Sequence, residues 1–200
     1  MKKSWNEVSI SEWKAIKEIV ESDMEPLEKN VETIAVLEGL TPNQVWAMPM
    51  YKIQQITNTM GWMENFEFNQ KARLDRVKID GQVYDITTDL NRLTVAAYSD
   101  FQFYMENRDE NMGLILTCFI IPKGKEYGEG YDVKELAKLF EDKLSIVFWN
   151  EVFFSLIKNS LYSIKALEIY LDWKARRNPE IRELLNQKLT ELRDTYGFLL

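Results

Sequence analysis

The stretch SIVFWNEVFFSLI, residues Ser145–Ile157, combines one tryptophan and three phenylalanines with aliphatic residues. On a helical wheel its apolar residues form one continuous face and also occupy other sides of the helix. The continuous face holds Ile146, Trp149, Phe153, Leu156 and Ile157, and the other sides hold Val147, Phe148 and Phe154. A helix that is apolar almost all round must be buried on more than one side. The stretch therefore predicts either a central core helix or a helix that a second subunit partly covers.

A membrane-spanning role for this stretch is not expected. No part of the chain reaches the roughly 18 apolar residues in a row that a spanning helix needs. Within and after the aromatic run, Asn150, Glu151, Lys158 and Lys165 interrupt it. The N-terminus, MKKSWNEVSISEW, has two lysines but lacks the apolar segment of a signal peptide. We expect a protein of a reducing, cytoplasmic-type compartment with no membrane partner.

The charge balance argues against nucleic acid as a binding partner, because the formal net charge is −7. The one basic cluster, Lys174, Arg176 and Arg177, directly precedes Asn178–Pro179. Cations in the last turn of a helix interact favourably with its dipole, so a helix-end role explains this cluster. We expect no basic footprint for nucleic acid or for an anionic membrane.

The chain contains no histidine and a single cysteine, Cys118. Without histidine it has no serine triad, no Cys–His dyad and no His-based zinc site, and one thiol rules out a thiolate zinc site. Cys118 lies in the apolar run LILTCFII, which predicts a buried, unreactive thiol. Catalysis by carboxylates and metal binding by oxygen ligands stay open.

Two groups of carboxylates are candidates for such chemistry. The segment ENRDEN, residues 106–111, lacks the ligand spacing and the sharp-turn glycine of a calcium loop, so a solvated loop explains it better. Asp85 and Asp89 flank the residues ITT after a predicted turn. They could serve acid–base catalysis, but turn and cap chemistry explains them more simply. We therefore assign no catalytic, cofactor-binding or metal-binding residue and predict that the protein is not an enzyme.

The beginning of the chain predicts two helices. Ser11 is the expected N-cap of the first, since apolar residues recur at helical spacing after it. The second is expected over residues 26–38. Gly39 should end it, because glycine adopts the left-handed conformation that often follows a helix.

The segment LTPNQV, residues 40–45, is a strong signal for a further helix start. Thr41 is the expected N-cap, Pro42 suits the first helical position, and Gln44 completes a capping box. After a break at Pro49, the spacing of apolar residues predicts another helix over residues 50–63.

The middle of the chain changes character. RVKIDGQVYDI, residues 76–86, alternates apolar and polar residues around Asp80–Gly81, which is typical of a two-stranded hairpin with a type I′ turn. A helix is expected over residues 93–107. The segment NMGLILTCFIIPKG, residues 111–124, fits a short helix or a buried strand, and we favour the helix. A loop follows, and Asp132 should cap the next helix.

The last third predicts long helices. One is expected from Ser145 to Arg177, and a second restarts at Asn178–Pro179 and ends near Tyr196. The predicted fold class is therefore mainly α, with one small β-hairpin at about residues 76–86 and long C-terminal helices. Three parts are expected within one domain overall: a helical part over 1–66, a hairpin and helical core over 67–177, and a C-terminal helix and apolar tail over 178–200.

Aromatic residues are more numerous than one core helix requires. WAMPMYKI, YSDFQFYM and the tail TYGFLL add to the stretch at Ser145–Ile157, and aromatic residues are enriched at the buried centres of protein interfaces. This surplus favours a homo-oligomer. The candidate interface residues are Phe148, Trp149 and Phe153 on the aromatic stretch and Phe198, Leu199 and Leu200 in the tail.

Several segments in this order resemble a group of small proteins of tailed phages. They are IAVLEGLTPNQVWAMP, the hairpin VKIDGQVYDI, the run TVAAYSDFQFYMENRDENMGLILTCFIIPKGKEY and the aromatic stretch SIVFWNEVFFSLI. The order is similar to that of the small helical proteins of crAss-like phages that form rings between portal and tail. The resemblance spans most of the chain and rests on pattern rather than on an invariant motif.

The resemblance implies a non-enzymatic virion protein, a ring component of the head–tail connector or tail. Such a protein would assemble in the host cytoplasm into a homo-oligomeric ring around the DNA channel, in contact with the portal or with other tail and ring proteins. DNA would pass through the ring without specific binding, and no cofactor is implied. Phage tail assembly chaperones have a similar helical character, so a cytoplasmic chaperone is the alternative.

Overall fold

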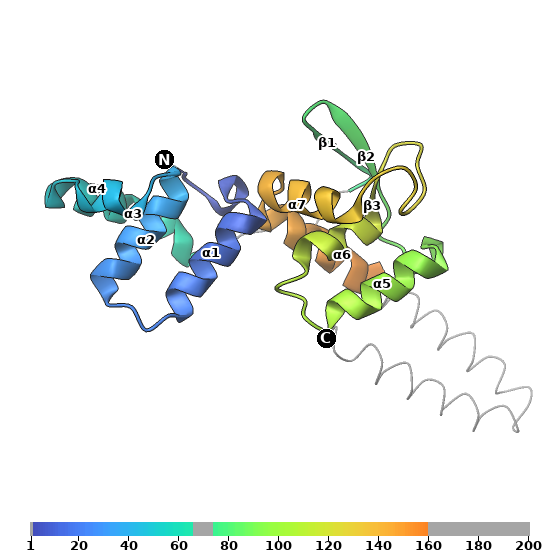
Figure 1. Ribbon diagram of the computed structural model, residues 1–200, viewed down its shortest axis with the longest axis horizontal. Coiled ribbons are helices and arrows are strands. Elements are labelled where there is room, and N and C mark those ends of the chain that lie inside the picture. The colour runs from blue at the N-terminus through green and yellow to red at the C-terminus, as the bar shows by residue number, and fades with distance from the viewer. Residues whose placement is uncertain (1, 66–73, 160–200) are drawn as a thin grey trace, which may run out of the picture.

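The computed structural model describes residues 2–65 and 74–159 (Figure 1). Within these ranges the protein is mainly helical and carries a small antiparallel sheet of three strands, which confirms the predicted fold class. The α-helices are α1 (Ile10–Glu21), α2 (Pro26–Glu38), α3 (Pro42–Trp46), α4 (Met50–Thr59), α5 (Val95–Met105), α6 (Met112–Phe119) and α7 (Val133–Lys143). The aromatic stretch forms a further helix, described over residues 146–159 and called the aromatic helix below.

The first helix begins two residues earlier than the sequence predicts. The N-cap of α1 is Ser9, not Ser11, because the Ser9 hydroxyl accepts a hydrogen bond from the Glu12 backbone N–H at 3.2 Å. The Glu12 carboxylate in turn accepts from the Ser9 backbone N–H at 2.8 Å. This reciprocal capping box satisfies two backbone donors at once, which Ser11 cannot do from its position inside the first turn.

The helix boundaries around Gly39 are as predicted. Gly39 adopts φ +64° at the end of α2, and the chain then enters α3 through the Thr41 capping box. The predicted helix over residues 50–63 is divided, because α4 ends at Thr59 and a 3₁₀ helix runs over Met60–Glu64. The hydroxyl of Thr59 donates to the Ile56 carbonyl at 2.6 Å, and such side-chain bonds compete with the regular helical pattern.

The predicted hairpin is present and gains a third strand. Strand β1 (Arg76–Ile79) pairs antiparallel with β2 (Gln82–Ile86) around a turn in which both Asp80 and Gly81 have positive φ, as a type I′ turn requires. Strand β3 (Ile120–Pro122) pairs with the other edge of β2. The ambiguous segment over residues 111–124 is therefore both helix and strand: α6 occupies its first part, and the chain turns directly into β3.

Two hydrophobic cores hold the described elements together. The main core surrounds α6, in which every residue except Leu114 is buried. It also includes residues from α1, β1, β2, α5, α7 and the aromatic helix. The second core is small and lies between α2, α3 and α4; it contains Val31, Ile34, Ala35, Val45 and Ile53. The first 3₁₀ helix (Trp5–Glu7) precedes α1, and another (Leu90–Arg92) precedes α5.

Helices α6 and α7 approach each other closely at Gly113. A Cβ atom at this position would lie 2.5 Å from the backbone oxygen of Ala137. The Gly113 N–H donates to the Glu141 carboxylate at 3.0 Å, so glycine allows both the close packing and this bond. The predicted Asp132 cap of α7 is confirmed, because its carboxylate accepts from the N–H groups of Lys134 and Glu135.

Several predictions lie outside the described residues. These are the helix beyond residue 159, the restart at Asn178–Pro179 and the apolar tail with Phe198, Leu199 and Leu200. The proposed boundary between residues 66 and 67 also falls in an undescribed range. The division into three parts stays a prediction.

Candidate functional site

The start of the aromatic helix is fixed by the N-terminal segment. Ser145 caps this helix, since its hydroxyl accepts from the Phe148 N–H at 3.1 Å. The backbone around Ser9 pairs antiparallel with Ser145, with the Ile10 N–H donating to the Leu144 carbonyl and the Ile146 N–H donating to the Val8 carbonyl. The first residues of the chain thus help to position the aromatic helix against α6 and α7.

The structure places two of the predicted interface residues in the chain's own core. Trp149 is 3% exposed and Phe153 is 8% exposed, and their rings stack with centroids 5.4 Å apart. The Arg108 guanidinium lies over the Phe153 ring, 5.6 Å from the ring centroid. Core packing, the first alternative that the sequence left open, therefore accounts for the burial of these two side chains.

Other aromatic residues of this helix keep contact with solvent. Phe148 is half-buried, and Phe154 is exposed. The interface role assigned to Phe148, Trp149 and Phe153 stays a prediction. Phe148 is the residue of the three that keeps surface available for a second subunit.

The largest exposed aromatic residues of the N-terminal part lie at the junction of α3 and α4. Trp46, the last residue of α3, is 50% exposed, and Tyr51 in the first turn of α4 is 64% exposed. Met50 beside them is also exposed. The surrounding exposed residues are uncharged except for one: they are Ala47, Pro49, Lys52, Gln54, Gln55 and Asn58. These nine residues are called the α3–α4 surface.

Helix α5 carries a second surface of this kind. Its inner side buries Ala97 and Phe101, of which Phe101 belongs to the main core, while its outer side is also rich in apolar residues. Val95 is 87% exposed and Phe103 is 66% exposed. At 100° per residue the exposed positions fall in one continuous arc, which consists of Val95, Ala96, Ser99, Gln102, Phe103 and Glu106. These six residues are called the α5 face.

The two surfaces lie at opposite ends of the described part. In Figure 1, α3 and α4 lie at the left end, and α5 lies on the right, beyond α1, α7 and α6. Each surface carries one charged residue, Lys52 on the α3–α4 surface and Glu106 on the α5 face. Both segments are aromatic-rich in the sequence, and the first also carries a clearer signal of a surface: Lys52 is the only charged residue between Glu38 and Glu64.

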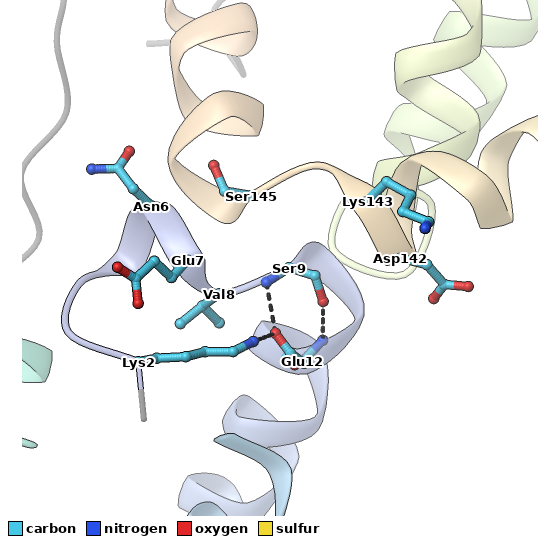
Figure 2. A pocket seen from close by; sticks show the side chains of 9 residues that line it. All are labelled: Lys2, Asn6, Glu7, Val8, Ser9, Glu12, Asp142, Lys143 and Ser145. Atoms are coloured by element: carbon cyan, nitrogen blue, oxygen red, sulfur yellow. Dashed lines mark hydrogen bonds and ion pairs between the residues drawn. The ribbon is translucent and has the colours of Figure 1, made fainter. Parts of the chain in front are cut away.

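A polar pocket of about 160 Å³ lies where the N-terminal segment meets α7 and the aromatic helix (Figure 2). Three of its charged groups already have partners: Lys2 pairs with Glu12, Glu12 also joins the Ser9 capping box, and Lys143 pairs with Asp80, which lies outside the pocket lining, at 3.2 Å. The pocket is therefore a joint between segments, and its chemistry offers no preorganised site for a ligand.

The loop over residues 106–111 joins α1 to the rest of the molecule. Lys17 of α1 donates to the Asp109 carboxylate at 2.6 Å, and Arg108 lies 2.9 Å from the same carboxylate. Burial alone would raise the pKa of Asp109, but the hydrogen bonds from Lys17 and Arg108 outweigh it and lower that pKa. The hydrogen bond to Asp109 raises the pKa of Lys17. Since cations already occupy this carboxylate, the loop is a structural link.

Cys118 is buried, and burial raises its pKa to about 12, as expected for an unreactive thiol. Beside it, the Tyr127 hydroxyl donates to the Asp100 carboxylate at 2.8 Å. Burial, first of all, and then this bond raise the pKa of Tyr127. The bond ties the loop that follows β3 to the inner side of α5, and so fixes the helix that presents the α5 face.

Within residues 2–65 and 74–159, no cluster of three or more histidine, cysteine or acidic side chains is arranged to hold a metal ion. In the same ranges, no helix has the length and apolar character to cross a bilayer. Asp89 caps the 3₁₀ helix that follows it, as cap chemistry predicts. Asp85 instead lies inside β2 and pairs with Arg76 of β1 at 2.8 Å, so it is a cross-strand partner and not a turn residue. No protein-family model, curated protein or solved structure matches the chain.

Proposed function

We propose that this chain is a non-enzymatic structural protein of a tailed phage, a ring component of the head–tail connector or tail. It would assemble in the host cytoplasm and act by self-association around the DNA channel. The observation that carries the proposal is the pair of exposed, apolar, charge-poor surfaces at opposite ends of the described part. Contacts between two different surfaces of identical copies generate rings when the rotation closes.

The composition of both surfaces supports an interaction role. Interface centres are enriched in aromatic residues and methionine and depleted in charged residues, and exposed apolar patches of this kind mark sites of interaction. Trp46, Met50 and Tyr51 meet this description on one surface, and Val95 and Phe103 meet it on the other. The resemblance of the sequence pattern to phage ring proteins supports the same assignment.

The net charge of −7 is consistent with a channel protein. A wall of negative charge repels phosphate, so DNA would move past it without the counterion release that drives binding. The purified protein should show no salt-sensitive affinity for duplex DNA at physiological ionic strength. Micromolar binding that weakens with added salt would count against the proposal.

Mass spectrometry of purified phage particles that encode this chain tests the proposal directly. A ring component is present in the particles in a fixed ratio to the portal, and the purified protein forms oligomers in solution. Absence from the particles would overturn the ring assignment and support the alternative, a tail assembly chaperone that uses the same exposed surfaces to bind a partner transiently.

A further inference from the structure

The two exposed surfaces carry opposite charges and are therefore suited to bind each other. We infer that the α3–α4 surface of one copy binds the α5 face of the next copy, so that identical chains join head to tail. This inference rests on the proposed function, since it names the contact through which the copies would associate. The partner is therefore a second copy of this chain.

The charges select this pairing over a symmetric one. The α3–α4 surface carries Lys52 as its one charged residue, and the α5 face carries Glu106. Two α3–α4 surfaces in contact would bring lysine toward lysine, and two α5 faces would bring glutamate toward glutamate. The head-to-tail pairing instead brings opposite charges together, and complementary charges set register and exclude wrong partners.

The acidity of the whole chain strengthens the argument. Each copy has a formal net charge of −7, so two copies repel each other over most orientations. Association is favoured where both partners present little negative charge, and the α3–α4 surface presents none. The α5 face presents only Glu106 at its C-terminal end, and the remaining residues of that face are uncharged.

The exposed aromatic residues can supply the centre of such a contact but not all of its area. Taking about 200 Å² for each aromatic side chain, the exposed parts of Trp46 and Tyr51 together offer roughly 230 Å². A stable interface buries about 800 Å² per partner. The aromatic residues would thus form the centre of the contact, and the flanking Gln, Asn and Ala residues would form its margin.

Complementary single variants test the pairing in the full-length chain. Tyr51→Glu places a negative charge on the α3–α4 surface, and Phe103→Glu places one on the α5 face. Each variant should be monomeric alone in native mass spectrometry, with association at least about 30-fold weaker than in the wild type. Mixed together, the two variants should form a 1:1 pair that does not grow, because each supplies the one intact surface that the other lacks.

A control variant and a fold check make the result specific. Val20→Glu changes a residue of α1 that is exposed but belongs to neither surface, and it should assemble like the wild type. Circular dichroism and thermal melting should be unchanged in all three variants, because each replaced side chain is mostly exposed. Isotope labelling of one variant identifies the mixed pair by mass.

The possible outcomes separate the pairing from the proposed function. A wild-type chain that stays monomeric at high micromolar concentration overturns self-association and with it the ring assignment. If wild type assembles but one variant alone still forms dimers, the contact is symmetric and the pairing is wrong, while the ring assignment stands. If Phe103→Glu lowers the melting temperature without changing assembly, the α5 face is covered by the chain's own residues, and the pairing is likewise wrong.

Disulfide trapping gives an independent measurement. The double variant Tyr51→Cys/Phe103→Cys should form a ladder of covalent oligomers under mild oxidation, and neither single variant should cross-link. The native Cys118 does not compete because it is fully buried. Dimers formed by one single variant alone would contradict the head-to-tail contact.

Discussion

The two hydrophobic cores differ in whether they bury aromatic side chains. The main core around α6 buries Phe101, Phe119, Phe140, Trp149 and Phe153, whereas the small core between α2, α3 and α4 contains only valine, isoleucine and alanine. Trp46 and Tyr51, which belong to the second region, stay exposed. Whether an aromatic side chain is buried therefore depends on the space in the core next to it, and not on the number of aromatic residues in the sequence.

The geometry of the helices explains the difference. Helix α6 is surrounded by α5, α7, the aromatic helix and β3, so aromatic rings can pack against it from several directions, as in the edge-to-face pair of Phe101 and Phe119. Helices α3 and α4 are short and bury only Val45 and Ile53. Two short helices can bury only one narrow apolar stripe, so their larger apolar side chains stay exposed to solvent.

The same substitution in the two regions gives the largest expected effect. Trp149→Ala should lower the free energy of unfolding by about 3–5 kcal/mol, because it leaves a cavity in the main core. Trp46→Ala should lower it by less than about 1 kcal/mol, since half of that side chain is exposed. Chemical denaturation of both variants measures the difference. Equal decreases in the free energy of unfolding would contradict the difference between the two regions.

Replacing one glycine in each region compares how closely the backbone is packed there. Gly113→Ala should cost about 1–3 kcal/mol of stability, because the added Cβ would meet the Ala137 backbone oxygen at 2.5 Å. The matched control is Gly61→Ala in the N-terminal part, where no atom lies within 4 Å of the added Cβ and the backbone is unstrained. That variant should be neutral or gain up to about 1 kcal/mol. Thermal melts that rank the two variants in the reverse order would contradict the packing described for α6 and α7.

The smallest expected effect concerns the ion pair between Lys17 of α1 and Asp109 in the loop over residues 106–111. The pKa of Asp109 is lowered from 3.8, so its stabilising contribution is full above pH 3.8 and is lost as the pH falls through the still lower folded value. The pKa of Lys17 is raised from 10.5, so its contribution is full below pH 10.5 and is lost as the pH rises through the higher folded value. Both contributions are constant near neutral pH.

Thermal melting of the wild type and Asp109→Asn over a pH series measures this link. The difference in melting temperature should be constant from about pH 5 to about pH 9 and should shrink at more acidic pH, where the wild-type carboxylate becomes protonated. A difference that persists unchanged in acid would show that Asp109 contributes through packing and not through its charge.

Local signals in the sequence predicted most helix boundaries, because caps and turns depend on neighbouring residues. Thr41, Gly39, Asp132 and the Asp80–Gly81 turn all take the predicted roles. For residues 111–124 a strand was only the less favoured alternative to a helix, because the pairing of β3 with β2 joins segments far apart in the chain and leaves no local periodicity. The Ser9 cap was missed in favour of Ser11, although Glu12 stands at the capping-box distance from Ser9.

The sequence predicted that aromatic residues would be exposed at a candidate interface, but not which ones. The sequence indicated an aromatic surplus, but it could not tell which aromatic residues the main core would absorb, since that depends on how α5, α6 and α7 surround the aromatic helix. For Trp149 and Phe153 the sequence left both core burial and an interface open, and both side chains are buried in the chain's own core, while Tyr51 and Phe103 are exposed. For Tyr51 the sequence held a separating signal, the run over residues 39–63 in which Lys52 is the only charged residue. It held no comparable signal for Phe103.

The attachment of α1 has a consequence for synthesis on the ribosome. Lys14 of α1 pairs with Glu141 of α7, 127 residues later in the chain, and the backbone at Ser9 pairs with Ser145. At about 5–20 residues per second, translation needs roughly 6–25 s to supply these later partners. During that interval the side of α1 that contacts α7 in the finished fold is still without that helix. Where several copies are translated on one message, the α7 of an older copy can reach this exposed side before the younger copy has made its own.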